Sequence, residues 1–282
     1  MKGCVDFGLL RGWASNPSGY RGAPYVYLTS MGKAIVTGLQ EFKNLYPIFQ
    51  IYQYKIMPDH IHMIIYKKDY SEIHLDDYME YLKDIIAVKS NTLFNSRLTR
   101  DQIFAEKYTD KPLYEGVNLN NWFSYLQENP RRRLTILQKP DFFKHIHKLR
   151  IKEKEFEAYG NPFLWDNPDK KAVRMRSSFS AEQRQNHAED CLFNASKGTI
   201  LVSPFISPYE KEVQRIAEKN NYPYILIQYL RFPDRYKPPK HQFELCEKGK
   251  LLIISLGMGE KTVLNHEICC MMNELAEKIA EG

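Results

Sequence analysis

The segment from residue 51 to residue 66 most strongly limits how this chain can fold. A strand-like apolar pattern at residues 51–56 and an apolar run at residues 63–66 flank a short turn that contains Pro58 and Asp59. Apolar residues on both sides of such a turn-forming pair predict a β-hairpin.

Two histidines, His60 and His62, fall at the start of the second predicted strand. Side chains two residues apart on a strand point to the same side, so both imidazoles could bind one cation while Ile61 turns into the core. The alternative is a pair of surface or half-buried histidines that bind no ligand.

A second pair, His145 and His147, lies in the charge-rich stretch from Lys144 to Lys154, which we expect to be a helical connector. On a helix, residues two apart diverge by about 200° around the axis and could not share a metal ion. We therefore expect this pair to lie on a solvated or DNA-facing helix.

A candidate nucleophile, Tyr125, lies in a short predicted helix. Asn120 and Asn121 are plausible N-caps and Pro130 is expected to end the helix. Tyr125 and Asn129 would then lie one turn apart on one face. Since the chain has 19 tyrosines, packing is the alternative role for any single one.

The motifs at residues 57–62 (MPDHIH) and 125–130 (YLQENP) together resemble the HUH single-tyrosine transposases, in particular the REP-associated tyrosine transposases. The resemblance implies that His60, His62 and Asn129 bind Mg²⁺ or Mn²⁺. It also implies that Tyr125 attacks single-stranded or hairpin DNA, forming a 5′-phosphotyrosine and a free 3′-hydroxyl that allow strand transfer. Independently of the family, a free phenol with a pKa near 10 is a weak nucleophile until a cation polarises the phosphate.

The first ten residues depart from the family pattern because they are only weakly strand-like. Either a degenerate first strand is present or the usual strand has been lost. Loss would put both stability and DNA cleavage in doubt.

The length of 282 residues predicts two domains. The turn-rich stretch from 159 to 168 favours a boundary near it, so we expect an HUH-like domain at 1–155 and a second domain at 156–282. Apolar strands alternate with amphipathic helices beyond it, a pattern typical of a parallel, Rossmann-like sheet.

The stretch 197–211 (KGTILVSPFISPYEK) resembles the Rossmann-like fold of DNA-processing protein A and its relatives. Ser203, Ser207 and Lys211 could line a crevice at the carboxyl ends of the strands. Equally, they could be caps and turn residues of a structural domain.

Basic residues near the proposed nucleophile are the candidates for DNA contacts. The net charge is +6, and phosphate contacts by lysine and arginine would supply salt-dependent affinity. A solvated helix end is the ordinary alternative for an arginine triplet. The proposed DNA-binding residues are Lys89, Lys107, Arg131, Arg132 and Arg133.

The five cysteines show no metal-ligand spacing and are expected to be reduced thiols. No signal peptide or membrane-spanning run is recognised, so a cytoplasmic location is expected. The sequence leaves open whether the chain is a monomer or a homodimer.

The predicted architecture is an α+β ferredoxin-like HUH domain followed by an α/β Rossmann-like parallel-sheet domain. The expected activity is that of a metal-dependent tyrosine transposase, a single-stranded DNA endonuclease and strand transferase. Two alternatives remain: a domesticated DNA-binding protein that does not cleave, and a protein that binds nucleotides or single-stranded DNA through its C-terminal domain.

Overall fold

The computed structural model describes residues 3–16, 19–68, 72, 74–95, 97–176 and 178–281. The chain divides into two compact units, Met1–Leu137 and Gln138–Gly282. The division therefore precedes the boundary expected after residue 155. Each unit has its own hydrophobic core.

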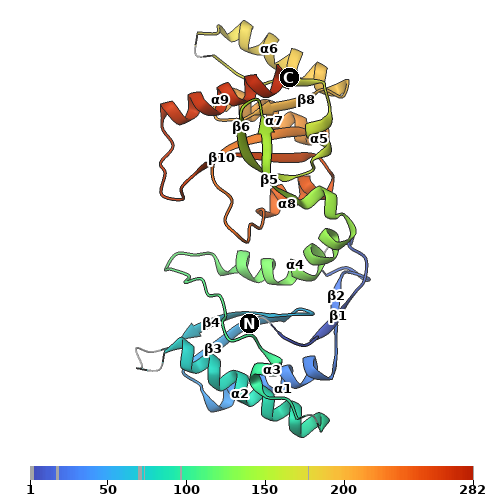
Figure 1. Ribbon diagram of the computed structural model, residues 1–282, viewed down its shortest axis with the longest axis vertical. Helices are drawn as coiled ribbons and strands as arrows, with labels where there is room; N and C mark the ends of the chain where they lie inside the picture. Colours follow the sequence, from blue (N-terminus) through green and yellow to red (C-terminus); the bar gives the residue numbers. More distant parts are fainter. Residues whose placement is uncertain are drawn as a thin grey trace. The chain divides into compact units, whose positions relative to one another are not determined.

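The first unit contains small antiparallel sheets and helices (Figure 1). Strands β1 and β2 form one pair, and β3 and β4 form another. The elements are β1 Gly8–Arg11, β2 Tyr25–Leu28, α1 Ser30–Leu45, β3 Phe49–Ile56, β4 Ile61–Lys67, α2 Leu75–Phe94, α3 Arg100–Ile103 and α4 Leu119–Gln138.

The hairpin formed by β3 and β4 confirms the strongest sequence prediction. Its register pairs Ile56 with Ile61 and Lys55 with His62. Ile56 and Ile61 are buried in the same core as residues of α1 and α2. Figure 1 shows α1 and α2 on one side of this hairpin and α4 on the other. His62, which alternates with Ile61, therefore points away from the core of α1 and α2.

The N-terminal region supplies a short strand that does not extend the β3–β4 hairpin. Gly8 pairs with Leu28 in the separate β1–β2 sheet, and Gly3 makes an isolated bridge with Phe104. Met1 and Lys2 lie outside the described residues. The weakly strand-like beginning of the chain thus forms a strand of four residues.

Helix α4 corrects the expectation that Pro130 ends the helix, because Pro130 lies inside it. Proline removes one hydrogen-bond donor and crowds the preceding turn, at a cost of about 3 kcal/mol in a helix interior. Leu126, Asn129 and Pro130 are all buried, and packing of this face offsets the unfavourable backbone effect. The helix consequently continues through the arginine triplet.

The second unit has a six-stranded mixed sheet in the order β5-β6-β10-β9-β8-β7. Four strands are parallel, as expected, whereas β5 and β6 are antiparallel to their neighbours. The elements are η1 Pro140–Phe143, β5 Lys144–Ile151, β6 Lys154–Gly160, α5 Phe163–Asp166, β7 Lys170–Ala172, α6 Ala181–Ser196, β8 Ile200–Ser203, α7 Pro208–Lys219, β9 Tyr224–Leu230, α8 Lys240–Glu247, β10 Leu251–Met258 and α9 His266–Ala280.

The prediction of a helical connector at 144–154 is wrong, because this segment forms β5 and the start of β6. Leu149 and Ile151 of β5 are buried among residues of β10 and α9. These tertiary contacts stabilise a strand rather than a helix. The charged residues of the segment show no clear strand or helix periodicity in the sequence. Because β5 belongs to the sheet of the second unit, the boundary lies before residue 138 and not after residue 155 as expected.

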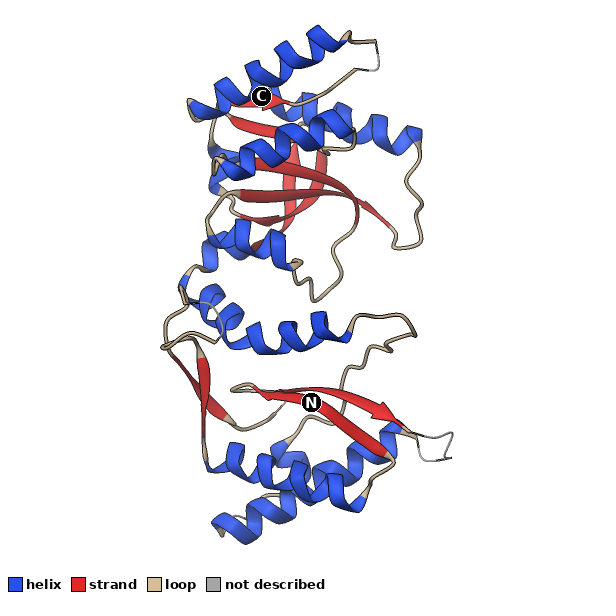
Figure 2. Ribbon diagram, turned by 180° about the vertical axis from the view of Figure 1, so that it is seen from behind, coloured by secondary structure: helices blue, strands red, loops and turns tan. Residues whose placement is uncertain are grey.

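Two apolar clusters flank the sheet of the second unit. One cluster includes Cys191 of α6, Val213 of α7 and Phe243 of α8. The other includes Ile268 and Met272 of α9. Figure 2 shows helices along the strands of this sheet. Strands covered by helices on both faces need continuous apolar runs, which explains the composition of β8, β9 and β10.

Candidate functional site

The two histidines of the hairpin meet at their Nε2 atoms. Nε2 of His60 lies 2.9 Å from Nε2 of His62, and the two rings are nearly perpendicular, at 85°. Their placement follows from the hairpin register, in which Met57 donates its backbone N–H to the carbonyl oxygen of His60. Two imidazole nitrogens at this separation can share a proton or bind one cation.

Asp59 fixes the orientation of the first histidine. Its Oδ1 atom lies 2.7 Å from Nδ1 of His60. An Nδ1–H donated to this carboxylate makes Nε2 of His60 the acceptor nitrogen, the arrangement found around metal-bound histidines. Burial raises the pKa of Asp59, but the hydrogen bond and electrostatic attraction of His60, together with the positive charge of Arg133, outweigh this effect. The pKa therefore lies below its usual value, which keeps the carboxylate ionised.

Tyr125 of α4 lies beside the histidines. The centroid of its ring is 6.4 Å from that of His62 and 6.2 Å from that of Trp122. The guanidinium of Arg132 lies 5.8 Å from the same ring centroid. Arg133 reaches the hairpin, with Nη2 3.6 Å from Oδ2 of Asp59. One face of α4 thus carries a phenol and two cations next to the imidazoles.

Asn129 lies one helical turn after Tyr125 and is 7% exposed. Its Nδ2 atom is buried without a hydrogen-bond partner. A buried amide donor without a hydrogen bond is costly, so an acceptor oxygen placed next to Nδ2 of Asn129 would lower this cost.

The other three proposed DNA-binding residues, Arg131, Lys89 and Lys107, differ in their position and in their partners. Arg131 pairs with Glu128, with Nη1 3.8 Å from Oε2. Lys89 forms an ion pair with Glu41 of α1 and therefore belongs to the helical layer across the hairpin from α4. Lys107 is exposed in the segment between α3 and α4. The structure brings Arg132 and Arg133 to the histidine and tyrosine cluster, and it does not bring Lys89 there.

Three residues near this cluster were missed in the sequence. Asp59 was treated only as a turn residue, whereas Lys55 and Gln127 were not considered. A pocket of about 360 Å³ is lined by Lys55, Gln127 and residues of the segment around β2, including Tyr25. Counting outward from the turn would have paired Lys55 with His62 and placed both on one face of the hairpin.

The second histidine pair lies on a strand, so the expectation that it could not share a metal ion is wrong. Within the described part of the chain, His145, His147 and Glu157 form a group whose ligand atoms all lie within 4.8 Å of one another. This group belongs to the second unit and is separate from the His60–His62 cluster.

A ligand crevice was expected at Ser203, Ser207 and Lys211, but the two serines form structural hydrogen bonds there. Ser203 donates to the carbonyl oxygen of Val173 at 2.8 Å, and Ser207 is the N-cap of α7. The buried carboxylate of Glu210 accepts three backbone N–H groups at 2.9 Å each, from Met175, Ile206 and Ser207. A side-chain carboxylate therefore takes the position that an anionic ligand would use at this helix start.

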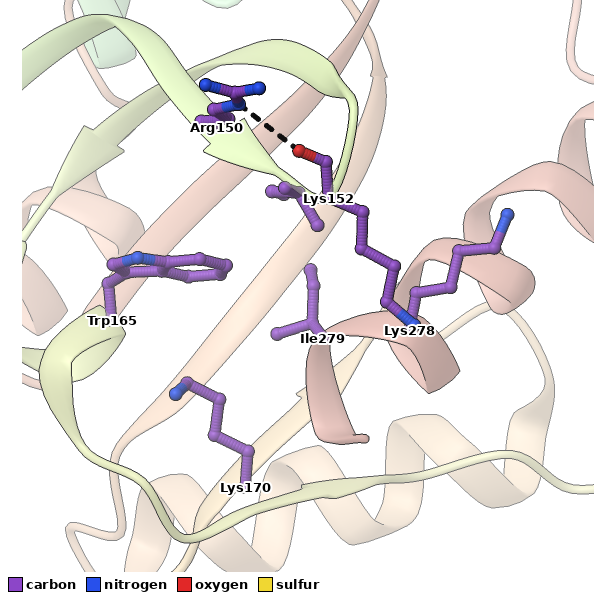
Figure 3. A pocket seen from close by; sticks show the side chains of 7 residues that line it. Arg150, Lys152, Trp165, Lys170, Lys278 and Ile279 are labelled. Atoms are coloured by element: carbon purple, nitrogen blue, oxygen red, sulfur yellow. Dashed lines mark hydrogen bonds between the residues drawn. The ribbon is translucent and has the colours of Figure 1, made fainter. Parts of the chain in front are cut away.

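A separate pocket of about 340 Å³ lies in the second unit and is lined by Arg150, Ile151, Lys152, Trp165, Lys170, Lys278 and Ile279. Figure 3 shows Trp165 and Lys170 on one side of it and Lys152 and Lys278 on the other. Nζ of Lys170 lies 5.2 Å from the ring centroid of Trp165. Burial lowers the pKa of Lys170, although the charge of Asp166 opposes this effect.

Comparisons with models of protein families, with curated proteins and with solved structures find no match. Across the described residues, none of the helices combines the length and apolar character needed to cross a bilayer. All five cysteines are free thiols, and Cys191 and Cys246 are buried.

Proposed function

We propose that the first unit is a metal-dependent tyrosine nuclease and strand transferase of the HUH type that acts on single-stranded or hairpin DNA. The observation that carries the proposal is the convergence of His60 and His62 at 2.9 Å beside the ring of Tyr125. No other tyrosine is needed for the chemistry, because a single phenol can both cleave and rejoin a strand.

The donor set fits a divalent cation. Two ligands about 2.1 Å from an ion and at right angles to each other are about 3.0 Å apart, close to the 2.9 Å between the two Nε2 atoms. Asp59 holds the required tautomer of His60, and the carbonyl oxygen of Asn129 would be a third ligand. The chemistry that a bound Mg²⁺ or Mn²⁺ supplies is polarisation of the scissile phosphate.

In the proposed reaction, Oη of Tyr125 forms a bond to the 5′ phosphorus while the bond to the 3′ oxygen breaks. The phenol proton passes to solvent, and the 3′ oxygen leaves as a hydroxyl after gaining a proton. Arg132, which lies over the Tyr125 ring, would hold the phosphate near the phenol. A second 3′-hydroxyl can reverse the step and join strands, because the phosphotyrosine retains the energy of the broken bond.

The order of elements supports the fold that this function implies. The sequence β2-α1-β3-β4-α2 matches the first five elements of the strand–helix–strand–strand–helix–strand order of a ferredoxin-like domain, although helices follow α2 and the strands form two separate pairs. The four parallel strands β7 to β10, with helices between them, likewise support a Rossmann-like assignment for the second unit.

The decisive experiment incubates the full chain with Mn²⁺ and hairpin oligonucleotides from the DNA that flanks its gene. The wild type should form a covalent adduct at Tyr125, identified by peptide mass spectrometry, and Tyr125→Phe should form none while still binding DNA. Tyr114→Phe is the matched control, because Tyr114 is 78% exposed. Cleavage that persists in Tyr125→Phe would contradict the proposal, and tight binding without any adduct would favour the non-cleaving DNA-binding protein.

A second candidate function, binding of a nucleotide or single-stranded DNA by the second unit, is favoured by the pocket around Trp165 and Lys170 (Figure 3). An aromatic ring can stack on a base while lysines contact phosphates. Fluorescence anisotropy of a labelled oligonucleotide should then show weaker binding by Trp165→Leu than by Trp13→Leu, a variant at an exposed tryptophan of the first unit. Equal affinities would exclude this pocket as the binding site.

A further inference from the structure

The histidines of β5 lie on the same side of a strand and face a carboxylate on the neighbouring strand. The ring centroids of His145 and His147 are 4.2 Å apart. His145 pairs with Tyr159, and Glu157 of β6 lies opposite His147 and Lys148, where the β5–β6 register shifts between Ile146 and Leu149. Such a bulge sets two residues of one strand against one residue of its partner and re-aims side chains.

One ring nitrogen of His145 is buried and faces a carboxylate. This atom, Nε2, makes no hydrogen bond, while Oε2 of Glu157 lies 3.7 Å away. The ring is covered by Phe232, with centroids 5.4 Å apart, and by Tyr159, at 6.1 Å. A covered nitrogen that faces a carboxylate needs a charge or ligand between them, because burying an unpaired polar atom is unfavourable.

The distances suit a small ion. Two ligands of a tetrahedral Zn²⁺ ion are about 3.4 Å apart, so the 3.7 Å separation between His145 and Glu157 needs little adjustment. The three ligand atoms already lie within 4.8 Å of one another. Because His147 is exposed, its ring can turn toward the ion. Lys148, which follows His147 on the strand, forms an ion pair with Glu155, with Nζ 3.8 Å from Oε2.

We propose that His145, His147 and Glu157 form a second metal site that binds Zn²⁺ or another divalent transition ion. Two imidazoles and one carboxylate select ions of this class over Mg²⁺, because nitrogen ligands suit zinc, nickel, copper and iron. The ion ties edge strand β5 to β6. The exposure of His147 leaves the remaining coordination positions open to solvent or to a further ligand.

This site can be tested without reference to the His60–His62 cluster. Calorimetry with Zn²⁺ on the His60→Ala/His62→Ala double variant of the full chain should still show one bound equivalent. Adding His147→Ala should remove that equivalent or weaken it by more than about 100-fold, beyond the usual effect of losing a supporting hydrogen bond. Replacing Zn²⁺ by Co²⁺ should give a visible absorption band that disappears with the same substitution.

The controls separate metal binding from folding and from ordinary ion pairing. His241→Ala removes another histidine beside a carboxylate, Glu218 at 3.0 Å, and should leave the stoichiometry unchanged. Glu157→Gln tests the third ligand if His147→Ala perturbs the strand, with circular dichroism checking the fold. One equivalent that persists in both His147→Ala and Glu157→Gln would overturn the proposal. Absence of binding in the His60→Ala/His62→Ala protein would do the same and would leave a simple His145–Glu157 ion pair.

Discussion

Oδ1 of Asp59 lies 2.7 Å from Nδ1 of His60, so the residue that forms the hairpin turn also orients the first candidate metal ligand. The adjacent positions of the two residues make this contact a local consequence of the turn. The same carboxylate faces Arg133 of α4 through its other oxygen. Asp59 thus connects the hairpin to the helix that carries Tyr125.

Removing this carboxylate should weaken metal binding more than it weakens the fold. We expect Asp59→Ala to raise the dissociation constant for Mn²⁺ by about 10–100-fold, because His60 would lose its fixed tautomer and orientation. Calorimetry measures the constant, and Asp234→Ala is the control at an exposed position in the other unit. Unchanged Mn²⁺ affinity in Asp59→Ala would mean that His60 does not bind the ion through Nε2.

Lys55, which pairs across the hairpin with His62 and lines the pocket beside Gln127, should contact a DNA phosphate. Lys55→Ala should weaken binding to all single-stranded sequences and reduce the slope of log affinity against log salt by about 0.7. Lys43→Ala, at an exposed position on α1, should leave the slope unchanged. Equal salt-dependence slopes for the two variants would show that Lys55 does not contact a DNA phosphate.

Glu210 should be important for stability rather than for ligand binding. Its carboxylate accepts three backbone hydrogen bonds. An amide at this position would place its NH₂ group, a donor, against backbone N–H groups that are also donors. We expect Glu210→Gln to lower the free energy of unfolding by about 1.5–3 kcal/mol, the range for hydrogen bonds to charged groups. Glu212→Gln, two residues along α7 and exposed, should leave denaturant unfolding unchanged. A stable Glu210→Gln variant would show that the helix start does not depend on this carboxylate.

Cys191 should resist alkylation while the protein is folded. Burial raises its pKa to about 11, although the charge of Lys171 opposes this effect. At pH 8 only about one thiol in a thousand would be ionised, and the thiolate is the reactive form. Mass spectrometry after iodoacetamide treatment should find Cys4, which is exposed, modified well before Cys191.

The raised pKa of Cys191 also makes the stability of the fold depend on pH. Between the usual thiol pKa and about 11, the folded state keeps a proton on Cys191 that the unfolded chain has lost. The free energy of unfolding should therefore fall as pH rises through this window. In guanidinium chloride both cysteines should react at similar rates. Rapid modification of Cys191 under native conditions would show that α6 opens from the sheet.

The local sequence determined the parts of this protein that depend on near neighbours. Strand periodicity and a turn at Pro58 and Asp59 fixed the β3–β4 hairpin and placed His60 and His62 on one side of it. Helical spacing likewise placed Tyr125 and Asn129 one turn apart on α4. These relationships follow from backbone geometry over a few residues, so they can be predicted without knowing the rest of the fold.

Only the tertiary structure decided the conformation of residues 144–154 and the course of α4. His145 and His147 lie in a charged stretch without a clear period, and pairing of β5 with β6 selects the strand. Pro130 stays within a helix because its face is buried. In both cases contacts between distant residues outweigh local preferences, and they created the His145–His147–Glu157 group that helical spacing would have excluded.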